Sequence, residues 1–282
     1  MKLGLVFSFL NPENRMLLEA AEAGGVQVEK IIDASLMPVL NSNSLPKMDI
    51  ILQRSASFSR SLYITKCFEV AGVPVLNSHA VQSICGDKAL TTLALASAGL
   101  PVPQTVIAFT PEEALKAIEQ VGYPAVLKPV VGSWGRLLAK VNDREAAEAV
   151  LEHKDELGSY MHKVYYVQEY VEKLKQRDIR AIVVGDEVVC AMYRKNGESW
   201  RTNVALGAIG EKCEVTSELG ELCLNAAKAV GSGVLGIDIF ESERGLLVNE
   251  INHAVEFKGM VAATGVDVAG KIVDYAIGLA HA

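Results

Sequence analysis

The sequence lacks the cysteine spacings that build disulfide frameworks or structural zinc sites. Its five cysteines are odd in number, lie far apart and never form a CxxC pair. We therefore expect each of them to be a small buried side chain with no role in covalent cross-linking.

Long hydrophobic runs are also absent. No apolar run approaches the roughly 20 residues that a membrane-spanning helix needs. The apolar stretch from Leu3 to Phe7 is followed by Ser8, Asn11 and Pro12 and has no small-residue cleavage site, so it indicates a strand and not a signal peptide. We expect a protein that stays in the cytosol, with no membrane partner.

An excess of positive charge and the common nucleotide-binding loops are missing as well. The net charge of -7 argues against nucleic acid as a partner, because phosphate backbones bind to basic faces. No GxGxxG turn follows the first strand, and no GxxxxGK[ST] loop occurs. The remaining composition, 50% hydrophobic and 22% charged, is typical of a globular protein of one to three domains.

Strands and helices alternate from Met1 to about Asn77, which predicts a parallel sheet covered on both faces. The expected strands are Leu3–Phe7, Val28–Ile32, Ile50–Leu52 and Val73–Leu76, and the expected helices are Asn14–Ala23 and Arg60–Ala71. Polar residues follow the third strand, where open parallel sheets bind ligands. These residues are Arg54, Ser55, Ser59 and Arg60, and surface salt bridges explain the arginines equally well.

Two stretches near the C-terminus predict a cation site. The strand Leu246–Val248 delivers Glu250 and Asn252 to one face, because side chains two residues apart in a strand point the same way. Asp238 is a lone carboxylate in an apolar run, and it meets them if the two strands form a hairpin. Such oxygen ligands suit Mg²⁺ that is bound together with phosphates. Alternatively, Asp238 only accepts hydrogen bonds and the other two form a polar strand end.

Basic residues lie where an anion could bind. Lys128 ends a strand just before the turn Gly132–Arg136, whose backbone amides could face an anion, although most such turns are plain turns. A hairpin turning at Gly185-Asp186 brings Arg180 and Arg194 to the same end. Two guanidiniums held together repel unless an anion lies between them.

The order and spacing of these motifs resemble the ATP-grasp superfamily, and within it the branch related to the ribosomal-protein glutamate ligase RimK. The similarity spans nearly the whole chain. It rests on Gly86-Asp87-Lys88, Lys128-Pro129, Gly132 to Arg136, Gln168 to Val171, Asp178-Ile179-Arg180, Thr202-Asn203, Asp238 and Asn249 to Asn252. Cys85 to Lys88, Gly132 to Leu137, Val248 to Asn252 and Glu256 to Lys258 are more similar to the LysX and ArgX ligases.

The resemblance implies an α/β fold with α+β lobes, namely an ATP-grasp fold with an N-terminal Rossmann-like domain. The implied domains are residues 1–86, a central lobe at 87–167 and a C-terminal lobe at 168–282. Relatives couple the α-amino group of α-aminoadipate or glutamate to the C-terminal glutamate γ-carboxyl of LysW, an acidic carrier protein, in lysine or arginine biosynthesis. They use ATP and two Mg²⁺ ions, and they form homodimers or homotetramers.

The resemblance also implies residue roles. The ATP-binding residues would be Lys88, Lys128, Gly132, Ser133, Trp134, Gly135, Arg136, Gln168, Glu169 and Val171. The substrate-binding residues would be Arg180, Arg194, Thr202, Asn203, Asn252, Glu256, Phe257 and Lys258, with catalytic roles for Arg180, Arg194 and Asn203. The metal ligands would be Asp238, Glu250 and Asn252.

Several alternatives stay open at this point. The acceptor could be a different peptide or small molecule, and a non-catalytic nucleotide sensor is a further alternative. The stretches Asn203–Gly207 and Lys258–Met260 are expected to decide between glutamate and α-aminoadipate, which differ by one methylene. His253 is either structural or substrate-facing. An acidic carrier would need a basic docking cluster, either Arg54, Arg60 and Lys66 or Lys173, Lys175 and Arg177, unless these are only solvated faces.

Overall fold

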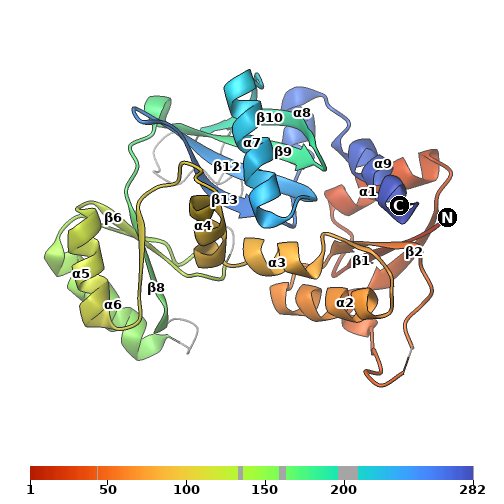
Figure 1. Cartoon of the computed structure of the whole chain (residues 1–282), viewed down its shortest axis with the longest axis horizontal. Helices are drawn as coiled ribbons and strands as arrows, with labels where there is room; N and C mark the ends of the chain where they lie inside the picture. The colour runs from red at the N-terminus through yellow and green to blue at the C-terminus, as the bar shows by residue number, and fades with distance from the viewer. Residues whose placement is uncertain (43, 133–135, 159–162, 196–208, 282) are drawn as a thin grey trace.

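The computed structural model describes the chain except residues 43, 133–135, 159–162, 196–208 and 282. Three separate sheets and their helices make up the described part (Figure 1). This is the mixed α/β architecture that the sequence predicts. The division of the chain at residues 86 and 167 stays a prediction.

The N-terminal sheet is parallel throughout and has the strand order β2-β1-β3-β4. Its strands are β1 (Lys2–Phe7), β2 (Gln27–Ile32), β3 (Ile50–Arg54) and β4 (Val75–Leu76). Alternate residues of β1 enter two different cores, since Leu5 packs with helix α1 (Pro12–Ala23) and Val6 packs with α2 (Phe58–Val70). The prediction of a parallel sheet covered on both faces is confirmed.

The central sheet is antiparallel, with the order β5-β8-β6-β7. Its strands are β5 (Thr105–Ala108), β6 (Ala125–Lys128), β7 (Ala139–Val141) and β8 (Tyr165–Glu169). Helices α5 (Pro111–Val121) and α6 (Arg144–Leu157) cover one face and share a small core with it. Asp143 accepts a hydrogen bond from the Ala146 amide and is the N-cap of α6.

The C-terminal sheet is also antiparallel, with the order β11-β10-β9-β12-β13. Its strands are β9 (Arg177–Val184), β10 (Glu187–Lys195), β11 (Ile209–Cys213), β12 (Val234–Ser242) and β13 (Gly245–Asn252). Helix α7 (Ser217–Val230) covers one face together with α3 (His79–Cys85) and α4 (Lys88–Ser97). The hairpin that turns at Gly185-Asp186 joins β9 to β10, as predicted.

The N-terminal and C-terminal sheets share one hydrophobic core. Helix α9 (Val268–Ala280) packs along α1, and α8 (Lys258–Thr264) contributes Met260 to the same core. Figure 1 shows the consequence, because the end of the chain returns to lie beside α1 and both termini sit at the same side of the molecule. The central sheet and its two helices project from the opposite side with a core of their own.

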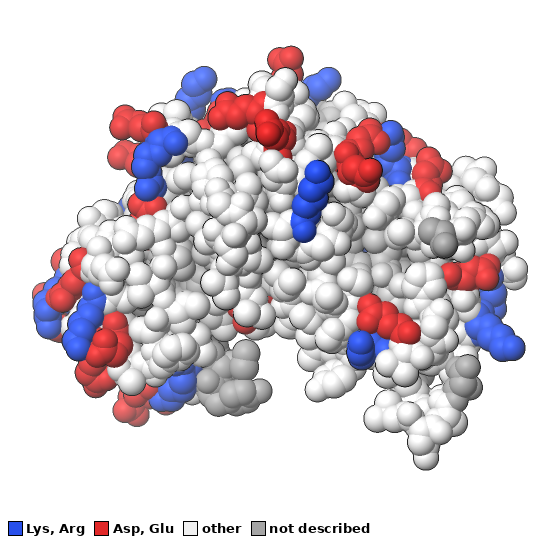
Figure 2. Space-filling view, in the orientation of Figure 1, with Lys and Arg blue, Asp and Glu red and all other residues white. Residues whose placement is uncertain are grey.

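The charged side chains lie mainly around the margin of the face shown in Figure 2. Its middle is largely uncharged, and the α3 and α4 segments there contribute few charged residues. No helix within the described residues is both long enough and apolar enough to cross a membrane. All five cysteines are free thiols. Four of them are buried, as predicted, whereas Cys67 is only partly buried.

Candidate active site

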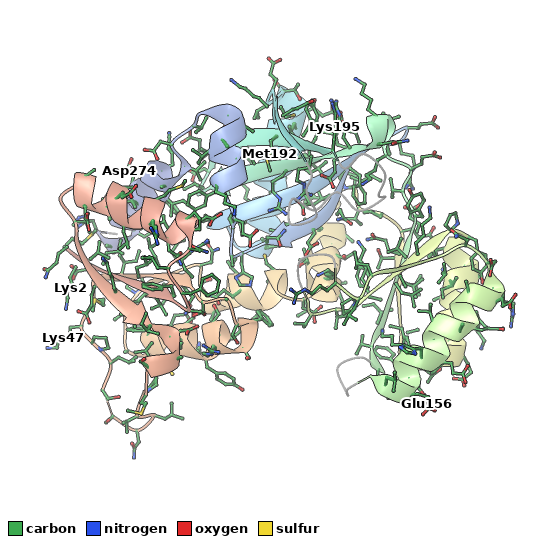
Figure 3. All side chains as sticks on the ribbon, turned by 180° about the vertical axis from the view of Figure 1, so that it is seen from behind. Lys2, Lys47, Glu156, Met192, Lys195 and Asp274 are labelled. Atoms are coloured by element: carbon green, nitrogen blue, oxygen red, sulfur yellow. The ribbon has the colours of Figure 1, made fainter. Side chains whose placement is uncertain are left out.

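A cleft of about 360 Å³ lies where the three sheets meet. Arg54 lines it from the N-terminal sheet, Lys128 and Gln168 line it from the central sheet, and Asp238 and Glu250 line it from the C-terminal sheet. Met192, labelled in Figure 3, is in the middle of the C-terminal sheet and also lines the cleft, whereas Lys195 lies further along β10, beyond it. Residues far apart in the sequence therefore meet in one concave site.

The three predicted metal ligands are brought together by the hairpin of β12 and β13. Asp238 is the direct cross-strand partner of Glu250, and Asn252 pairs with Gly236 two positions further along. Directly opposed side chains of antiparallel strands have Cβ atoms about 5 Å apart, so the two carboxylates share one face. The predicted hairpin and the convergence of these residues are confirmed.

Asp238 already has two cationic partners. The Arg180 side chain donates to both of its carboxylate oxygens, with Nη2 at 2.8 Å from Oδ2, and Arg194 Nη2 lies 3.0 Å from Oδ1. Arg194 also donates to Asp178 at 2.7 Å. Burial alone would raise the pKa of Asp238, but the two guanidiniums hold that pKa below its ordinary value. The anion that the paired arginines require is thus supplied by the protein itself.

Two lysines occupy the side of the cleft next to β13. Lys88 Nζ lies 3.2 Å from Glu250 Oε1 and donates to the carbonyl of Gly132 at 2.7 Å. Lys128 Nζ donates to Gln168 Oε1 at 2.7 Å and to Asn249 Oδ1 at 3.0 Å. Both partners of Lys128 are neutral amides, so its charge is not cancelled by a contacting carboxylate.

Burial sets the protonation of Lys128. The cost of burying its charge lowers the pKa of this lysine to about 8, although the nearby Glu250 carboxylate opposes the shift. Behind it, Gln168 donates to Tyr166 Oη at 3.0 Å, and that hydroxyl is hydrogen-bonded to Thr92 at 2.8 Å. The sequence analysis assigned no role to Asn249, although this residue begins the motif Asn249 to Asn252 that supports the resemblance.

The predicted adenine-side residues lie at the C-terminal end of β8, an inner strand of the central sheet, and just after it. Glu169 and Val171 line the cleft, and the Glu169 carboxylate accepts hydrogen bonds from the Gln104 amide and the Arg244 guanidinium, both at 2.7 Å. Gly132 and Arg136 line the cleft as well. The predicted residues Ser133, Trp134, Gly135, Thr202 and Asn203 lie outside the described part of the chain.

The loop after β13 corrects one prediction. Glu256 and Lys258 line the cleft, but Phe257 is fully buried in the shared core and does not line it. The alternation of an extended segment explains this, because neighbours of an inward side chain point outward. The Lys258 amide donates to the buried Glu13 carboxylate at 3.2 Å, a contact that joins this loop to α1 and that was not predicted.

His253 lines the cleft between Asn252 and this loop. Burial, and then the charge of Arg54, lower the pKa of its imidazole to about 4. Its ring centre lies 5.8 Å from that of Phe58. His253 is therefore a neutral side chain in the cleft wall at neutral pH.

The proposed basic docking clusters do not form as simple patches. Arg54 lines the cleft, whereas Arg60 pairs with Asp33 at 2.8 Å. Arg177 donates to both carboxylate oxygens of Glu241, at 2.6 and 3.2 Å. Intramolecular carboxylates therefore bind part of each predicted cluster.

Two family models together match nearly the whole chain. The RimK-like ATP-grasp domain matches residues 85–276, and the LysX preATP-grasp domain matches residues 3–84. The chain belongs to the RimK-like ATP-grasp family. It is therefore an ATP-dependent ligase, and the fold and enzyme class expected from the sequence are confirmed.

Curated relatives of this RimK-like chain are similar over almost their full length. The chain is 38% identical to the glutamate–LysW ligase ArgX of Sulfurisphaera tokodaii over 278 residues, which cover 98% of each protein. It is 37% identical to the α-aminoadipate–LysW ligase LysX of Saccharolobus solfataricus, over 94% of this chain and 96% of that protein. A RimK domain protein from Sphaerobacter thermophilus has a similar structure, with a TM-score of 0.83, 27% identity and coverage of 99% and 100% of the two chains.

The residues at the hairpin fit a hard cation. Asp238 and Glu250 supply carboxylate oxygens, and Asn252, two positions along the same strand, adds an amide oxygen. Within those residues no cluster of three His, Cys, Asp or Glu side chains forms a metal site. A set of two carboxylates and one amide suits Mg²⁺, which fills its remaining positions with water and phosphate oxygens.

Proposed function

We propose that this enzyme joins the α-amino group of glutamate or α-aminoadipate to the γ-carboxyl of the C-terminal glutamate of a LysW-type carrier protein. The observation that carries the proposal is the near full-length similarity to enzymes named for this reaction, together with a cleft lined by all the described ligand groups expected for it except Phe257. The product amide would protect the amine during later steps of lysine or arginine biosynthesis.

ATP would bind with its phosphates between the two lysines and the hairpin. Lys128 is held by neutral amides and Lys88 lies beside Glu250, so both ammonium groups face the region where phosphate oxygens would lie. Asp238, Glu250 and Asn252 would hold two Mg²⁺ ions, which neutralise phosphate charge when bound. The adenine and ribose would lie against Gln168, Glu169 and Val171, at and just after the C-terminal end of β8.

The chemistry proceeds in two steps. A carboxylate oxygen of the carrier's terminal glutamate attacks the γ-phosphorus, and the bond to the β-phosphate oxygen breaks to release ADP. The substrate amine then attacks the carbonyl carbon of the acyl phosphate, and inorganic phosphate and a proton leave. Arg180 and Arg194 stand beside Asp238, where they can stabilise the negative charge that develops on the transferred phosphoryl group.

Positioning supplies much of the rate in such a mechanism. Holding the acyl phosphate and the amine in one closed cleft converts an encounter into an intramolecular step, worth up to ~7 to 11 kcal/mol in well-oriented cases. This reaction requires no covalent enzyme intermediate. It is consistent with a site that contains lysines, arginines and carboxylates, and a histidine whose pKa of about 4 suits neither strong acid nor strong base catalysis.

The test is ligation with purified components. Incubation with ATP, Mg²⁺, a LysW-type carrier and an equal mixture of glutamate and α-aminoadipate should yield ADP and a carrier whose mass has increased by one amino-acid residue. The mass distinguishes the two amino acids directly. ADP release without a mass increase of the carrier, or modification of an unrelated peptide with equal efficiency, would contradict the carrier assignment.

Sequence identity to known enzymes does not distinguish glutamate from α-aminoadipate as the substrate. The chain is 38% identical to an ArgX enzyme and 37% identical to a LysX enzyme. A single methylene contributes about 1 to 3 kcal/mol to discrimination, so the competition experiment is the direct way to rank them. A cytosolic location and a homodimeric or homotetrameric assembly complete the proposal.

A further inference from the structure

The guanidinium of Arg54 lies in the wall of the cleft, and the proposed reaction gives it no role so far. Arg54 is the last residue of β3, at the carboxyl end of the parallel N-terminal sheet. Its Nε is 3.4 Å from Asn14 Oδ1, and its guanidinium lies 6.0 Å from the centre of the Phe257 ring. Both of these partners are uncharged.

The charge of Arg54 is not neutralised by a contacting carboxylate. Among the residues that the structure describes, Arg54 forms no ion pair, whereas neighbouring Arg60 does. Burial lowers the pKa of the Arg54 guanidinium, and the carboxylates of Glu13 and Glu256 offset only part of that shift. Glu13 itself accepts a hydrogen bond from the Lys258 amide. A half-buried cation without a paired anion favours an anionic ligand.

The position of Arg54 separates it from the phosphate side of the cleft. Lys88 contacts Glu250 and Lys128 contacts Asn249, so both lysines lie against β13 of the C-terminal sheet. Arg54 is the last residue of β3 and lines the cleft from the N-terminal sheet.

We propose that Arg54 binds a substrate carboxylate through its planar guanidinium, which matches a carboxylate with two parallel hydrogen bonds. This inference rests on the proposed function for the identity of the substrates. The carboxylate can come from the amino acid, or from the C-terminal α-carboxylate of the carrier, since its γ-carboxyl is the group that reacts. The chemistry at Arg54 is the same in both cases.

Binding measured by calorimetry tests this without turnover. The enzyme, saturated with ADP and Mg²⁺, is titrated with glutamate, with α-aminoadipate and with the carrier. Each carboxylate is then replaced by an amide, using isoglutamine, glutamine and a carrier amidated at its C-terminus. In wild type, amidation of the carboxylate that meets Arg54 should weaken binding roughly 10- to 100-fold.

The Arg54→Gln variant provides the comparison. It should bind the carboxylate form as weakly as wild type binds the amide, and it should bind the amide as wild type does. A change confined to the amino acids identifies them as the source, and a change confined to the carrier identifies the carrier. Arg54→Lys should recover part of the affinity. The inference is overturned if Arg54→Gln binds every ligand within twofold of wild type, or loses carboxylate and amide affinity equally.

Two controls separate this result from misfolding and from failure of the proposed function. Arg15→Gln changes an exposed arginine of α1 outside the cleft and should leave all affinities unchanged. Affinity for ADP should be the same in every variant, because Arg54 lies away from the lysines. If wild type binds these carboxylates through Arg54 but makes no ligated carrier, the proposed function fails while the carboxylate site stands.

Discussion

The two sides of the cleft differ in how their positive charges are balanced. On the C-terminal sheet, Arg180 and Arg194 both pair with Asp238, and Lys88 pairs with Glu250. At the end of the N-terminal sheet, Arg54 contacts uncharged groups. The first side therefore contains its own counterions, and the second does not.

The difference indicates what each side has to do. On the first side, carboxylates neutralise the cationic side chains, so several charged groups can lie close together. A bound triphosphate and its cations would replace some of these contacts. Arg54, a half-buried cation with no paired anion among the described residues, can gain an ion pair when a ligand carboxylate arrives. Lys128 lies between these cases, because it is fixed in place by two neutral amides.

Removing the carboxylates should have the largest effects and should separate stability from activity. Asp238→Ala leaves two buried guanidiniums without their shared partner, which we expect to cost about 3 to 5 kcal/mol in the free energy of unfolding as well as activity. Glu250→Ala removes a side chain that is 25% exposed, so its unfolding free energy should change by about 1 kcal/mol or less. Its ATP-dependent ligation should still fall by more than about 100-fold.

Chemical denaturation and an ADP-release assay of both variants check this prediction. Glu250→Gln keeps the size of the side chain and should lose activity like Glu250→Ala. Full turnover by a folded Glu250→Ala enzyme would contradict the metal assignment. Equal loss of stability in the two alanine variants would contradict the described charge balance.

The pH dependence of nucleotide binding should come next in size. Lys128 is cationic below its pKa of about 8 and neutral above it. The affinity of the free enzyme for Mg·ATP should therefore be constant below about pH 8 and fall by up to about tenfold per pH unit above it. Lys128→Arg, which stays charged, should abolish this slope in titrations between pH 7 and 9.5. An identical slope in both proteins would assign the dependence to another group.

The amide that holds Lys128 should have a smaller effect. Asn249→Ala removes the hydrogen bond at 3.0 Å and leaves the one from Gln168. Loss of one charge-assisted hydrogen bond corresponds to about 1.5 kcal/mol, or roughly a tenfold rise in the KM for ATP with a smaller change in kcat. Steady-state kinetics at varied ATP measure this. A fall in kcat with no change in KM would show that Asn249 does not act through nucleotide binding.

The smallest effect should come from an ion pair outside the cleft. Arg144 of α6 pairs with Glu119 and Glu148 and is 60% exposed. Arg144→Ala should lower the free energy of unfolding by about 1 kcal/mol or less, because solvent screens exposed pairs. Thermal unfolding measures the change, and kcat and KM should match wild type. A loss as large as that of Asp238→Ala would remove the distinction between buried and exposed charges.

Much of the fold follows from local sequence signals. Helix α6 begins and ends where the Asp143 cap and the apolar spacing place it, and the hairpin turn at Gly185-Asp186 has the residues its geometry needs. Other elements have weak local signals. Helices α3 and α8 are short, β5 is an edge strand after two prolines, and β11 is a polar edge strand.

Local sequence patterns also predicted part of the candidate site. The hairpin register fixed the meeting of Asp238 with Glu250, and that register follows from a two-strand pattern in the sequence. The paired arginines were expected to bind an anion, but their counterion is Asp238, which lies 58 residues after Arg180 in the sequence. Contacts such as Asn249 with Lys128, 121 residues apart, depend on how the sheets pack, so no local pattern reveals them.

A crystal structure with Mg²⁺ and a non-hydrolysable ATP analogue tests the central claim most directly. We predict a nucleotide in the cleft with its β- and γ-phosphates contacting Lys88 and Lys128, and with Mg²⁺ between those phosphates and the oxygens of Asp238, Glu250 and Asn252. An analogue bound elsewhere, or a nucleotide in this cleft whose phosphates contact neither lysine and whose cations avoid those three side chains, would contradict the account.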